Sequence, residues 1–181
     1  GTLGGALVMN AGTDIGWIGD LVERAAFLTL AGDFVEKSCE QLCYRYRHSA
    51  LQGGGLIVLE ATLRLAPGDR AAIEAKMARL EAKRTSRQPT GCHTAGSTFK
   101  NQPDIAAGKL LDRSGCKGLR VGGAAVSDKH ANFIIAEAGA TASDILTLAF
   151  EMRRRVRDTF DRELELEVEL VGDWSGWTPG G

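Results

Sequence analysis

The sequence predicts an α+β fold, because short apolar segments typical of strands are interspersed irregularly with two long amphipathic helices. Its 181 residues, 44% hydrophobic and 25% charged, suit one or two globular domains with a buried core. The formal net charge of −1 argues against a nucleic-acid partner, which requires a concentrated basic surface. No apolar run approaches the ~20 residues that cross a bilayer, and no charged-then-apolar leader opens the chain, so we expect a cytoplasmic protein that makes no membrane contact.

The first segment is rich in glycine, with glycines at positions 1, 4, 5 and 12 around the apolar run 6–9. Glycines permit close backbone approach or positive φ, and the run suits a short buried element. A flat ligand or a phosphate could lie there, and a tight turn beside the core is the alternative. Further on, residues 56–65 mix β-branched and apolar side chains between Gly53-Gly54-Gly55 and Pro67-Gly68, which predicts a strand bounded by turns.

Two helices follow. Residues 69–85 carry Ile73, Met77 and Leu80 at positions i, i+4 and i+7, which predicts a surface helix with one buried face. Residues 106–114 form a shorter helix closed by Gly115.

A second long helix begins at the sequence Thr141-Ala142-Ser143-Asp144, which resembles a capping box. Its apolar stripe, which we expect to be buried, comprises Ile145, Leu148, Ala149, Met152, Val156 and Phe160. The arginines at 153–155 and 157 face largely away from the stripe, so we interpret them as a solvated surface rather than a phosphate site. After the helix, residues 164–170 alternate strictly between apolar side chains and glutamates, which predicts a half-buried strand. Residues 172–181 are expected to form a loosely ordered tail.

The four cysteines, Cys39, Cys43, Cys92 and Cys116, form no pair of Cys-x-x-Cys hooks, and the chain has enough apolar content to fold without disulfides. Free thiols are therefore expected. A zinc site formed by Cys39, Cys43, Cys92 and His93 is disfavoured, because the ligand spacing matches no structural zinc site. No metal is predicted.

Three short segments offer groups for proton and anion chemistry. Ser97 is a weak acid that can protonate a strongly basic carbanion if its alkoxide is supported, and Lys100 and Asn101 are suitable support. Arg47 offers a charged planar fork for a carboxylate, and Glu167 can hold or shuttle a proton. This set fits reduction of a carbon–carbon double bond conjugated to a carboxylate. The alternative is structural: Arg47 pairs with a surface carboxylate, Ser97 caps a turn and Glu167 faces solvent.

Six motifs in order resemble the UDP-N-acetylenolpyruvoylglucosamine reductase family, also called UDP-N-acetylmuramate dehydrogenase, over its C-terminal two-thirds. They are Gly1-Thr2-Leu3-Gly4-Gly5-Ala6 through Asn10-Ala11-Gly12, Tyr46-Arg47-His48-Ser49, Gly96-Ser97-Thr98-Phe99-Lys100-Asn101, Ala107-Gly108-Lys109-Leu110, Gly118-Leu119-Arg120-Val121-Gly122-Gly123-Ala124-Ala125-Val126-Ser127 followed by Lys129-His130-Ala131-Asn132-Phe133, and Glu165-Leu166-Glu167-Val168. The resemblance runs from residue 1 to residue 172.

The resemblance implies a flavoenzyme of peptidoglycan precursor synthesis, in which NADPH reduces a bound FAD and the enolpyruvyl group of a UDP-sugar is then reduced to give UDP-N-acetylmuramate. It implies that Ser97 is the proton donor and that Arg47 and Glu167 stabilise the intermediate. The implied substrate contacts are Tyr46, Lys100, Asn101, Lys129, His130 and Asn132. The implied flavin-facing residues are Gly1, Thr2, Gly4, Gly5, Asn10, Ala11 and Gly12.

The same resemblance predicts three parts: residues 1–94 as the C-terminal part of an FAD-binding domain, residues 95–172 as an α+β substrate-binding domain, and residues 173–181 as a tail. The chain opens without methionine inside a glycine-rich turn, so we expect a fragment or a truncated product that lacks the segment gripping much of the FAD. The chain departs from the family pattern at Gln102, Cys116 and Leu166, none of which is an implied catalytic residue. No oligomeric state is predicted.

Two alternatives remain open. One is a non-catalytic UDP-sugar-binding fragment, because the substrate half is whole while the start is missing. The other is a flavin domain of a different oxidoreductase, which would need neither Ser97 nor Glu167.

Overall fold

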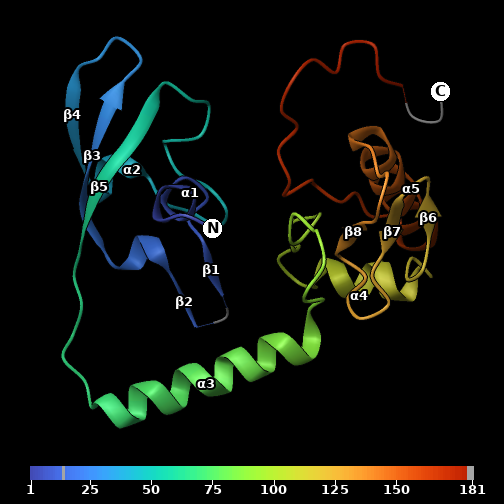
Figure 1. Cartoon of the computed structure of the whole chain (residues 1–181), viewed down its shortest axis with the longest axis horizontal. Coiled ribbons are helices and arrows are strands. Elements are labelled where there is room, and N and C mark those ends of the chain that lie inside the picture. The colour runs from blue at the N-terminus through green and yellow to red at the C-terminus, as the bar shows by residue number, and fades with distance from the viewer. Residues whose placement is uncertain (14, 179–181) are drawn as a thin grey trace. The chain divides into compact units, whose positions relative to one another are not determined.

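The computed structural model describes residues 1–13 and 15–178. The chain divides into two compact units, one of residues 1–69 and one from residue 70 onward, and each is described by itself. Both combine helices with small antiparallel sheets, which confirms the predicted α+β class (Figure 1). Within the described residues, no helix is both long and apolar enough to cross a membrane.

The first unit is built around a three-stranded antiparallel sheet in the order β4-β3-β5. Its elements are α1 (Leu3–Val8), β1 (Gly12–Thr13), β2 (Gly16–Trp17), the 3-10 helix η1 (Ile18–Asp20), β3 (Val22–Thr29), β4 (Phe34–Ser38), α2 (Cys39–Leu42) and β5 (Leu56–Leu63). The strand predicted over residues 56–65 is therefore confirmed as β5. Its register with β3 shifts next to Ala26 and Phe27, where the ladder carries a bulge.

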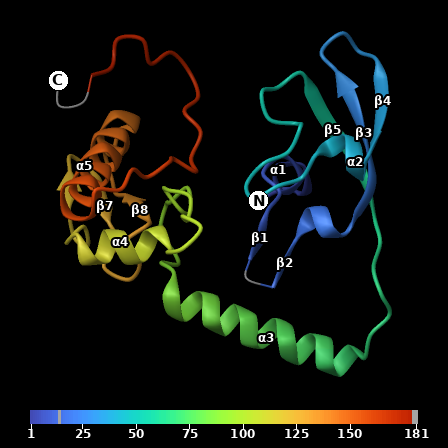
Figure 2. The same cartoon turned by 180° about the vertical axis from the view of Figure 1, so that it is seen from behind.

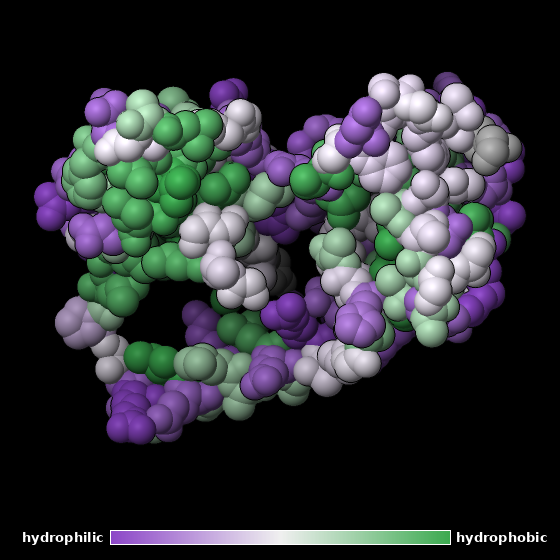
Figure 3. All heavy atoms as spheres, turned by 45° about the horizontal axis from the view of Figure 1, so that its top comes forward, coloured by the Kyte–Doolittle hydropathy of each residue, from purple (hydrophilic) through white to green (hydrophobic). Residues whose placement is uncertain are grey.

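Helices α1 and α2 supply the apolar cover for this sheet (Figure 2). Leu7 of α1, Phe27 of β3 and Leu42 of α2 are fully buried in one cluster. Other large apolar side chains of the same strands stay in solvent: Phe34 is 66% exposed and Ile57 is 51% exposed. Figure 3 shows hydrophobic residues gathered on the surface of this unit. The sheet therefore buries only part of its apolar surface within the unit.

The second unit contains a second antiparallel sheet, in the order β6-β7-β8. Its elements are α3 (Arg70–Arg87), α4 (Ala107–Arg113), β6 (Arg120–Val121), β7 (Ala124–Val126), β8 (Ile134–Ala136) and α5 (Ala142–Phe160). Helix α5 packs across the sheet and α4 packs against α5. The predicted short helix is confirmed as α4, and the predicted capping box opens α5, with Asp144 N–H donating to Thr141 Oγ1 and Thr141 N–H donating to Asp144. The predicted stripe of α5 is buried or packed against the core.

The prediction of a buried face on the helix over residues 69–85 is wrong. Helix α3 forms as Arg70–Arg87, but none of its 18 residues, all of which are described, is buried. Ile73 is 47% exposed and Met77 is 64% exposed. The i, i+4 spacing shows that these side chains share a face of the helix, but it does not supply an element to cover that face.

The predicted strand over residues 164–170 is also wrong. Only Leu166 takes part in a β-bridge, with Phe99, and this bridge is isolated. Two hydrogen bonds flank it, from Lys100 N–H to the Glu165 carbonyl and from Glu167 N–H to the Thr98 carbonyl. Alternation indicates which side chains face a core, and Leu164 is indeed buried, but a strand also needs a partner of equal length. Residues 98–100 provide only this short one.

The tail has no helix or strand over residues 172–178, and residues 179–181 lie outside the described part. Its two tryptophans nevertheless make contacts: the Trp177 ring lies 5.0 Å from the Phe150 ring of α5 and 6.3 Å from the Trp174 ring. The four cysteines are free thiols. Burial raises the pKa of the Cys116 thiol to about 11, so this thiol stays protonated at neutral pH.

Candidate functional site

Tyr46 and Arg47 are the two central residues of a tight turn. Arg45 and His48 close the turn with two reciprocal backbone hydrogen bonds of 3.0 Å. Arg47 takes a φ of 50°, in the left-handed region that side chains rarely adopt. Such backbone strain is characteristic of functional sites, where surrounding bonds hold it in place.

Contacts with Gly12, Trp17 and Gln52 hold the Arg47 turn, residues 45–48. The guanidinium donates to the Gly12 carbonyl at 3.3 Å and lies 5.4 Å from the centre of the Tyr46 ring. The Tyr46 ring in turn lies 5.8 Å from the Trp17 ring. Behind the turn, the Gln52 amide donates to the Arg47 carbonyl at 3.1 Å. The cation is therefore presented against an aromatic and glycine surface rather than on a flexible arm.

The glycine-rich segment folds as α1 and the β1–β2 hairpin. Thr2 caps α1 by accepting a hydrogen bond from Gly5 N–H at 3.1 Å. A Cβ on Gly12 would lie 2.3 Å from the Trp17 ring, so glycine is required there for the ring to pack. Gly1, Thr2 and Gly5 are exposed.

Asn10 and Ser49 lie under the Arg47 turn. The Asn10 side chain is 1% exposed, and both of its polar atoms bond to backbone: Nδ2 donates to the Arg45 carbonyl at 2.8 Å, and Oδ1 accepts from Gly19 N–H at 3.0 Å. Ser49, which is fully buried, donates from Oγ to the Val8 carbonyl at 2.6 Å. The sequence motifs contained both residues, and the fold gives them these contacts.

In the second unit, Ser97 lies on residues 93–99 (the Ser97 segment), which pair with the β8 side of the sheet. His93 and Ser97 form isolated antiparallel bridges with Ala136 and Phe133. On its other side, the same segment meets residues 165–167 through the Phe99–Leu166 bridge. Ser97 and Glu167 therefore come from adjacent, hydrogen-bonded segments, although 70 positions separate their numbers in the chain. The Ser97 hydroxyl has no hydrogen-bond partner among the described residues.

The Asn132 side chain holds this segment from the β8 side. Its Oδ1 accepts from Phe99 N–H at 3.0 Å and its Nδ2 donates to the Phe99 carbonyl at 2.8 Å. Its own carbonyl accepts from Thr98 N–H at 2.8 Å. Asn132 is 2% exposed, so the side chain faces the protein interior.

Lys100 and Asn101 continue the segment. The Lys100 ammonium pairs with the Glu165 carboxylate across the bridge, and Asn101 Oδ1 accepts from Ala107 N–H at 3.0 Å at the start of α4. Gln102, which the sequence identifies only as a departure from the family pattern, makes two further hydrogen bonds. Its amide donates to the Glu163 carbonyl at 2.7 Å, while its Oε1 accepts from Arg162 at 2.8 Å.

Lys129 and His130 lie in the turn before Asn132. Lys129 is exposed, and its ammonium donates to the Thr85 carbonyl at the end of α3 at 2.6 Å. The His130 ring is half-buried, lies edge-on to Phe133 at 4.9 Å, and accepts from Asn132 N–H at 3.2 Å. Burial, with the nearby Lys117 charge, lowers the pKa of His130, so the ring is neutral at pH 7.

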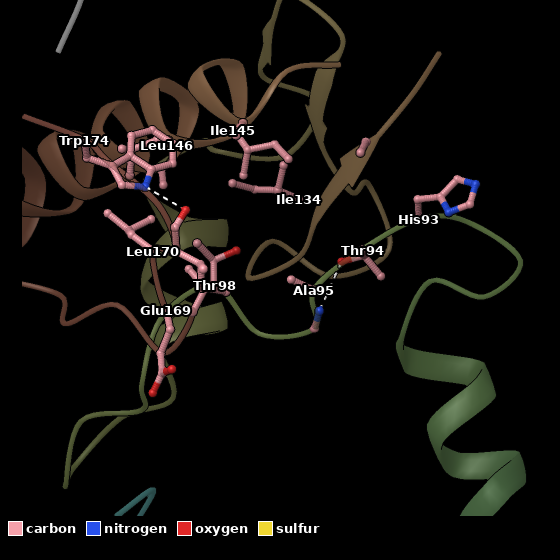
Figure 4. Close-up of a pocket in the computed structure, with 16 residues that line it drawn as sticks. His93, Thr94, Ala95, Thr98, Ile134, Ile145, Leu146, Glu169, Leu170 and Trp174 are labelled. Atoms are coloured by element: carbon pink, nitrogen blue, oxygen red, sulfur yellow. Dashed lines mark hydrogen bonds between the residues drawn. The ribbon is translucent and has the colours of Figure 1, made fainter. Parts of the chain in front are cut away.

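An apolar cavity of about 330 Å³ lies beside the Ser97 segment (Figure 4). Gly96 and Thr98 contribute to one wall, and Ile145, Leu146 and Trp174 to another. Figure 4 shows the Trp174 ring above Leu170, with its Nε1 hydrogen donated to a backbone oxygen, which belongs to Val171 at 3.3 Å. The lining is predominantly hydrocarbon, so the cavity offers little polar recognition.

The predicted site residues thus form two groups. Arg47, Tyr46 and the glycine-rich segment belong to the first unit. The second unit holds Ser97, Lys100, Asn101, Lys129, His130, Asn132 and Glu167.

Comparison with known proteins shows that the segments carrying both groups are similar to one family of reductases. Residues 88–171 match the family model described as UDP-N-acetylenolpyruvoylglucosamine reductase, C-terminal domain. Relatives of that name are 43% identical in Shouchella clausii and 44% identical in Sphingopyxis alaskensis, over 96% and 95% of this chain. The chain matches the C-terminal part of this reductase family. It spans 56% and 57% of the lengths of these two relatives.

A solved reductase structure supports the fold. The crystal structure of UDP-N-acetylenolpyruvylglucosamine reductase from Thermus caldophilus superposes with a TM-score of 0.79 at 40% sequence identity. The match covers 92% of this chain and 59% of that chain. Both units thus lie within the part of the chain that resembles reductases of known structure.

Proposed function

We propose that this chain supplies the substrate side and the anion-binding arginine of an FAD-dependent, NADPH-linked reductase that converts UDP-N-acetylglucosamine enolpyruvate to UDP-N-acetylmuramate. The observation that carries the proposal is the 43% identity to a reductase of that name over 96% of the chain. The product is a precursor of peptidoglycan, so the proposed setting is the bacterial cytoplasm.

Arg47 is proposed to bind the carboxylate of the enolpyruvyl group. Its left-handed backbone and its contact with the Gly12 carbonyl favour one orientation of the guanidinium. A cation held in position lowers the energy of the transition state in which negative charge develops on the carboxylate. No reorganisation of the guanidinium is then needed during the reaction. Tyr46, whose ring contacts the tilted Trp17 ring and the Arg47 guanidinium, is proposed to contact the substrate beside Arg47.

Ser97 is proposed to donate the proton that completes reduction of the double bond. Its hydroxyl has no partner among the described residues, so it does not have to break an internal hydrogen bond to act. Glu167 lies on the neighbouring segment and is proposed to stabilise the intermediate and to hold or shuttle a proton.

The other proposed substrate contacts are Lys100, Asn101, Lys129, His130 and Asn132. For Asn132, whose side chain is buried on Phe99, the contact would be made through the backbone it holds. For His130, the contact would be made by a neutral ring.

FAD, when bound, would supply the hydride. Thr2 and Gly5 are exposed and small, so a flat ring could approach the backbone there, next to the proposed flavin-facing residue Gly1. Gly4 and Ala11 are small as well; Gly4 lies in the first turn of α1, and Ala11 follows that helix. Asn10 and Gly12 can contribute backbone only, because Asn10 points inward and Trp17 fills the space beside Gly12.

A second candidate is a UDP-sugar-binding fragment without catalysis. The observation that favours it is the family-model match over residues 88–171, which contain Ser97, Glu167 and the other proposed substrate contacts of the second unit. The reductase requires bound flavin, whereas the binding fragment does not.

The test is a titration of the 181-residue chain with FAD, followed by NADPH oxidation with and without UDP-N-acetylglucosamine enolpyruvate. Flavin binding with substrate-dependent oxidation supports the reductase. Binding of the UDP-sugar in calorimetry without flavin binding supports the fragment. If the chain and the full-length product of its gene both fail to bind the UDP-sugar, the proposal is wrong.

A further inference from the structure

The Asn10 side chain lies at the junction of three segments of the first unit. It follows α1, it accepts a hydrogen bond from Gly19 of η1, and it donates one to the Arg45 carbonyl at the base of the Arg47 turn. Asparagine is suited to this position because it has one donor group and one acceptor on a short stem. With 1% of its surface exposed, it makes these bonds away from water, where an unmade bond is costly.

Ser49 provides a second bond between the same two segments, running in the opposite direction. Asn10 donates from the α1 side to the residue that begins the turn, whereas Ser49, just after the turn, donates to the Val8 carbonyl of α1. The two bonds together fix the base of the turn to the end of α1. The Arg47 guanidinium adds a third contact, to Gly12 on the same stretch.

The local backbone is specialised for this junction. Asn10 has a φ of 45°, a left-handed conformation that asparagine tolerates better than most residues. Gly19 must lack a side chain, because a Cβ there would lie 2.8 Å from Asn10 Oδ1 and 2.7 Å from the Tyr44 ring. These features bring the side chain of Asn10 within reach of Arg45.

We propose that Asn10 is a positioning residue that sets the orientation of the Arg47 turn relative to the glycine-rich segment. It does not touch substrate, and it acts through the Arg45 carbonyl. The inference that Asn10 orients the turn rests on geometry alone. Its consequence for catalysis rests on the proposed function of Arg47. The two parts can therefore fail separately.

Two variants separate the bonds of Asn10. Asn10→Asp keeps the acceptor for Gly19 but removes the donor to the Arg45 carbonyl and places two oxygens against each other. Asn10→Ala removes both bonds. The matched control is Thr29→Val in the β3–β4 hairpin of the same unit. Like Asn10→Ala it removes two side-chain bonds: the one that Thr29 Oγ1 accepts from Asp33 N–H and the one that it donates to the Asp33 carboxylate.

The first measurement is amide hydrogen exchange by NMR on the chain without ligands. In both Asn10 variants we expect exchange at the Arg45 and His48 amides, which close the turn, to accelerate about tenfold or more. Amides of the β3–β5 ladder should change no more than in Thr29→Val. Unchanged exchange at the turn would overturn the proposal. An equal acceleration at all amides would overturn it as well, because Asn10 would then support only the overall fold.

The second measurement uses the full-length product of the gene, loaded with FAD. We expect Asn10→Asp to lower kcat/KM for the enolpyruvyl substrate about tenfold, to lower the rate of flavin reduction by NADPH less than this, and to add nothing in an Arg47→Ala background. If Arg47→Ala itself leaves kcat/KM unchanged, the proposed function of Arg47 is wrong while the exchange result still stands. If Asn10→Asp impairs both half-reactions equally, its catalytic consequence is wrong.

Discussion

Asn132 holds Phe99 by both backbone groups, accepting from its N–H and donating to its carbonyl. A side-chain amide placed in this way imitates a neighbouring strand, and it does so at residue 132, before β8 begins at Ile134. The Ser97 segment is thus secured two residues away from the proposed donor. Because the Phe99 side chain is 1% exposed and belongs to the core, the segment is fixed from the backbone and from the ring.

Replacing Asn132 should therefore destabilise the second unit. Asn132→Ala leaves the Phe99 N–H and carbonyl buried without partners, and we expect a loss of about 2–3 kcal/mol in the free energy of unfolding. Asn132→Asp, which keeps only the acceptor, should also destabilise. Urea unfolding followed by circular dichroism checks both variants. A loss below about 0.5 kcal/mol in Asn132→Ala would show that water replaces the amide.

Replacing Ser97 should leave stability unchanged and impair turnover. Its hydroxyl has no partner among the described residues, so Ser97→Ala should change stability by less than about 0.5 kcal/mol. In the FAD-loaded full-length product, flavin reduction by NADPH should be unchanged, whereas turnover of the enolpyruvyl substrate should fall by ~10²–10⁴, typical of a lost general acid. Single-turnover kinetics separates the two half-reactions. Equal losses in both would contradict the assignment of Ser97 as proton donor.

Removing the Tyr44 hydroxyl should stabilise the first unit. This hydroxyl is buried and has no hydrogen-bond partner within the described structure. Burial, and to a lesser extent Cys39, raises the pKa of Tyr44 to about 12, which is consistent with a poorly solvated phenol. We expect Tyr44→Phe to raise the free energy of unfolding by about 1 kcal/mol, because a buried polar atom without a partner is lost. A lower unfolding midpoint in urea would indicate that the hydroxyl is bonded in solution.

His130 should make stability depend on pH. Burial holds its pKa below the ordinary value of 6.5. The unfolded chain then binds a proton more readily than the folded chain, so this contribution to stability is present above pH 6.5 and is lost as pH falls. We expect urea midpoints to fall between pH 7 and pH 5. His130→Gln, which can still accept from Asn132 N–H, should fall less steeply. Parallel pH profiles for the two proteins would exclude His130 as the source.

Much of the fold could be predicted from sequence because local signals and tertiary packing agree there. The capping box at Thr141 and Asp144 and the apolar stripe of α5 predict a buried helix, and the sheet of the second unit lies across that stripe. Strand β5 is bounded by the turns that the glycines and Pro67 predict. Where local signals and tertiary cover disagree, the prediction fails: Ile73 and Met77 share a helical face that stays exposed.

The candidate site was only partly predictable, because motifs report which residues recur and not what each side chain contacts. Ser97 and Glu167 were identified from motifs, and the structure adds that their segments are hydrogen-bonded neighbours. The inward orientation of Asn10 has no local signal, since its partners Gly19 and Arg45 are defined by the fold. Gln102 bridges Arg162 and Glu163 for the same reason.

The way the Ser97 segment is held has a consequence for the order of folding. The hydrogen bonds between Phe99 and Asn132 join residues 33 positions apart in the chain, whereas the ion pair between Lys100 and Glu165 joins residues 65 positions apart. Doubling the length of a closed loop adds only ~0.6 kcal/mol of entropy, so the energetic difference is small. On the ribosome, however, the difference is one of time. In a nascent chain the bonds between the Ser97 segment and Asn132 can form well before α5 has been synthesised. The bonds to residues 165–167, which include Glu167, can form only afterwards.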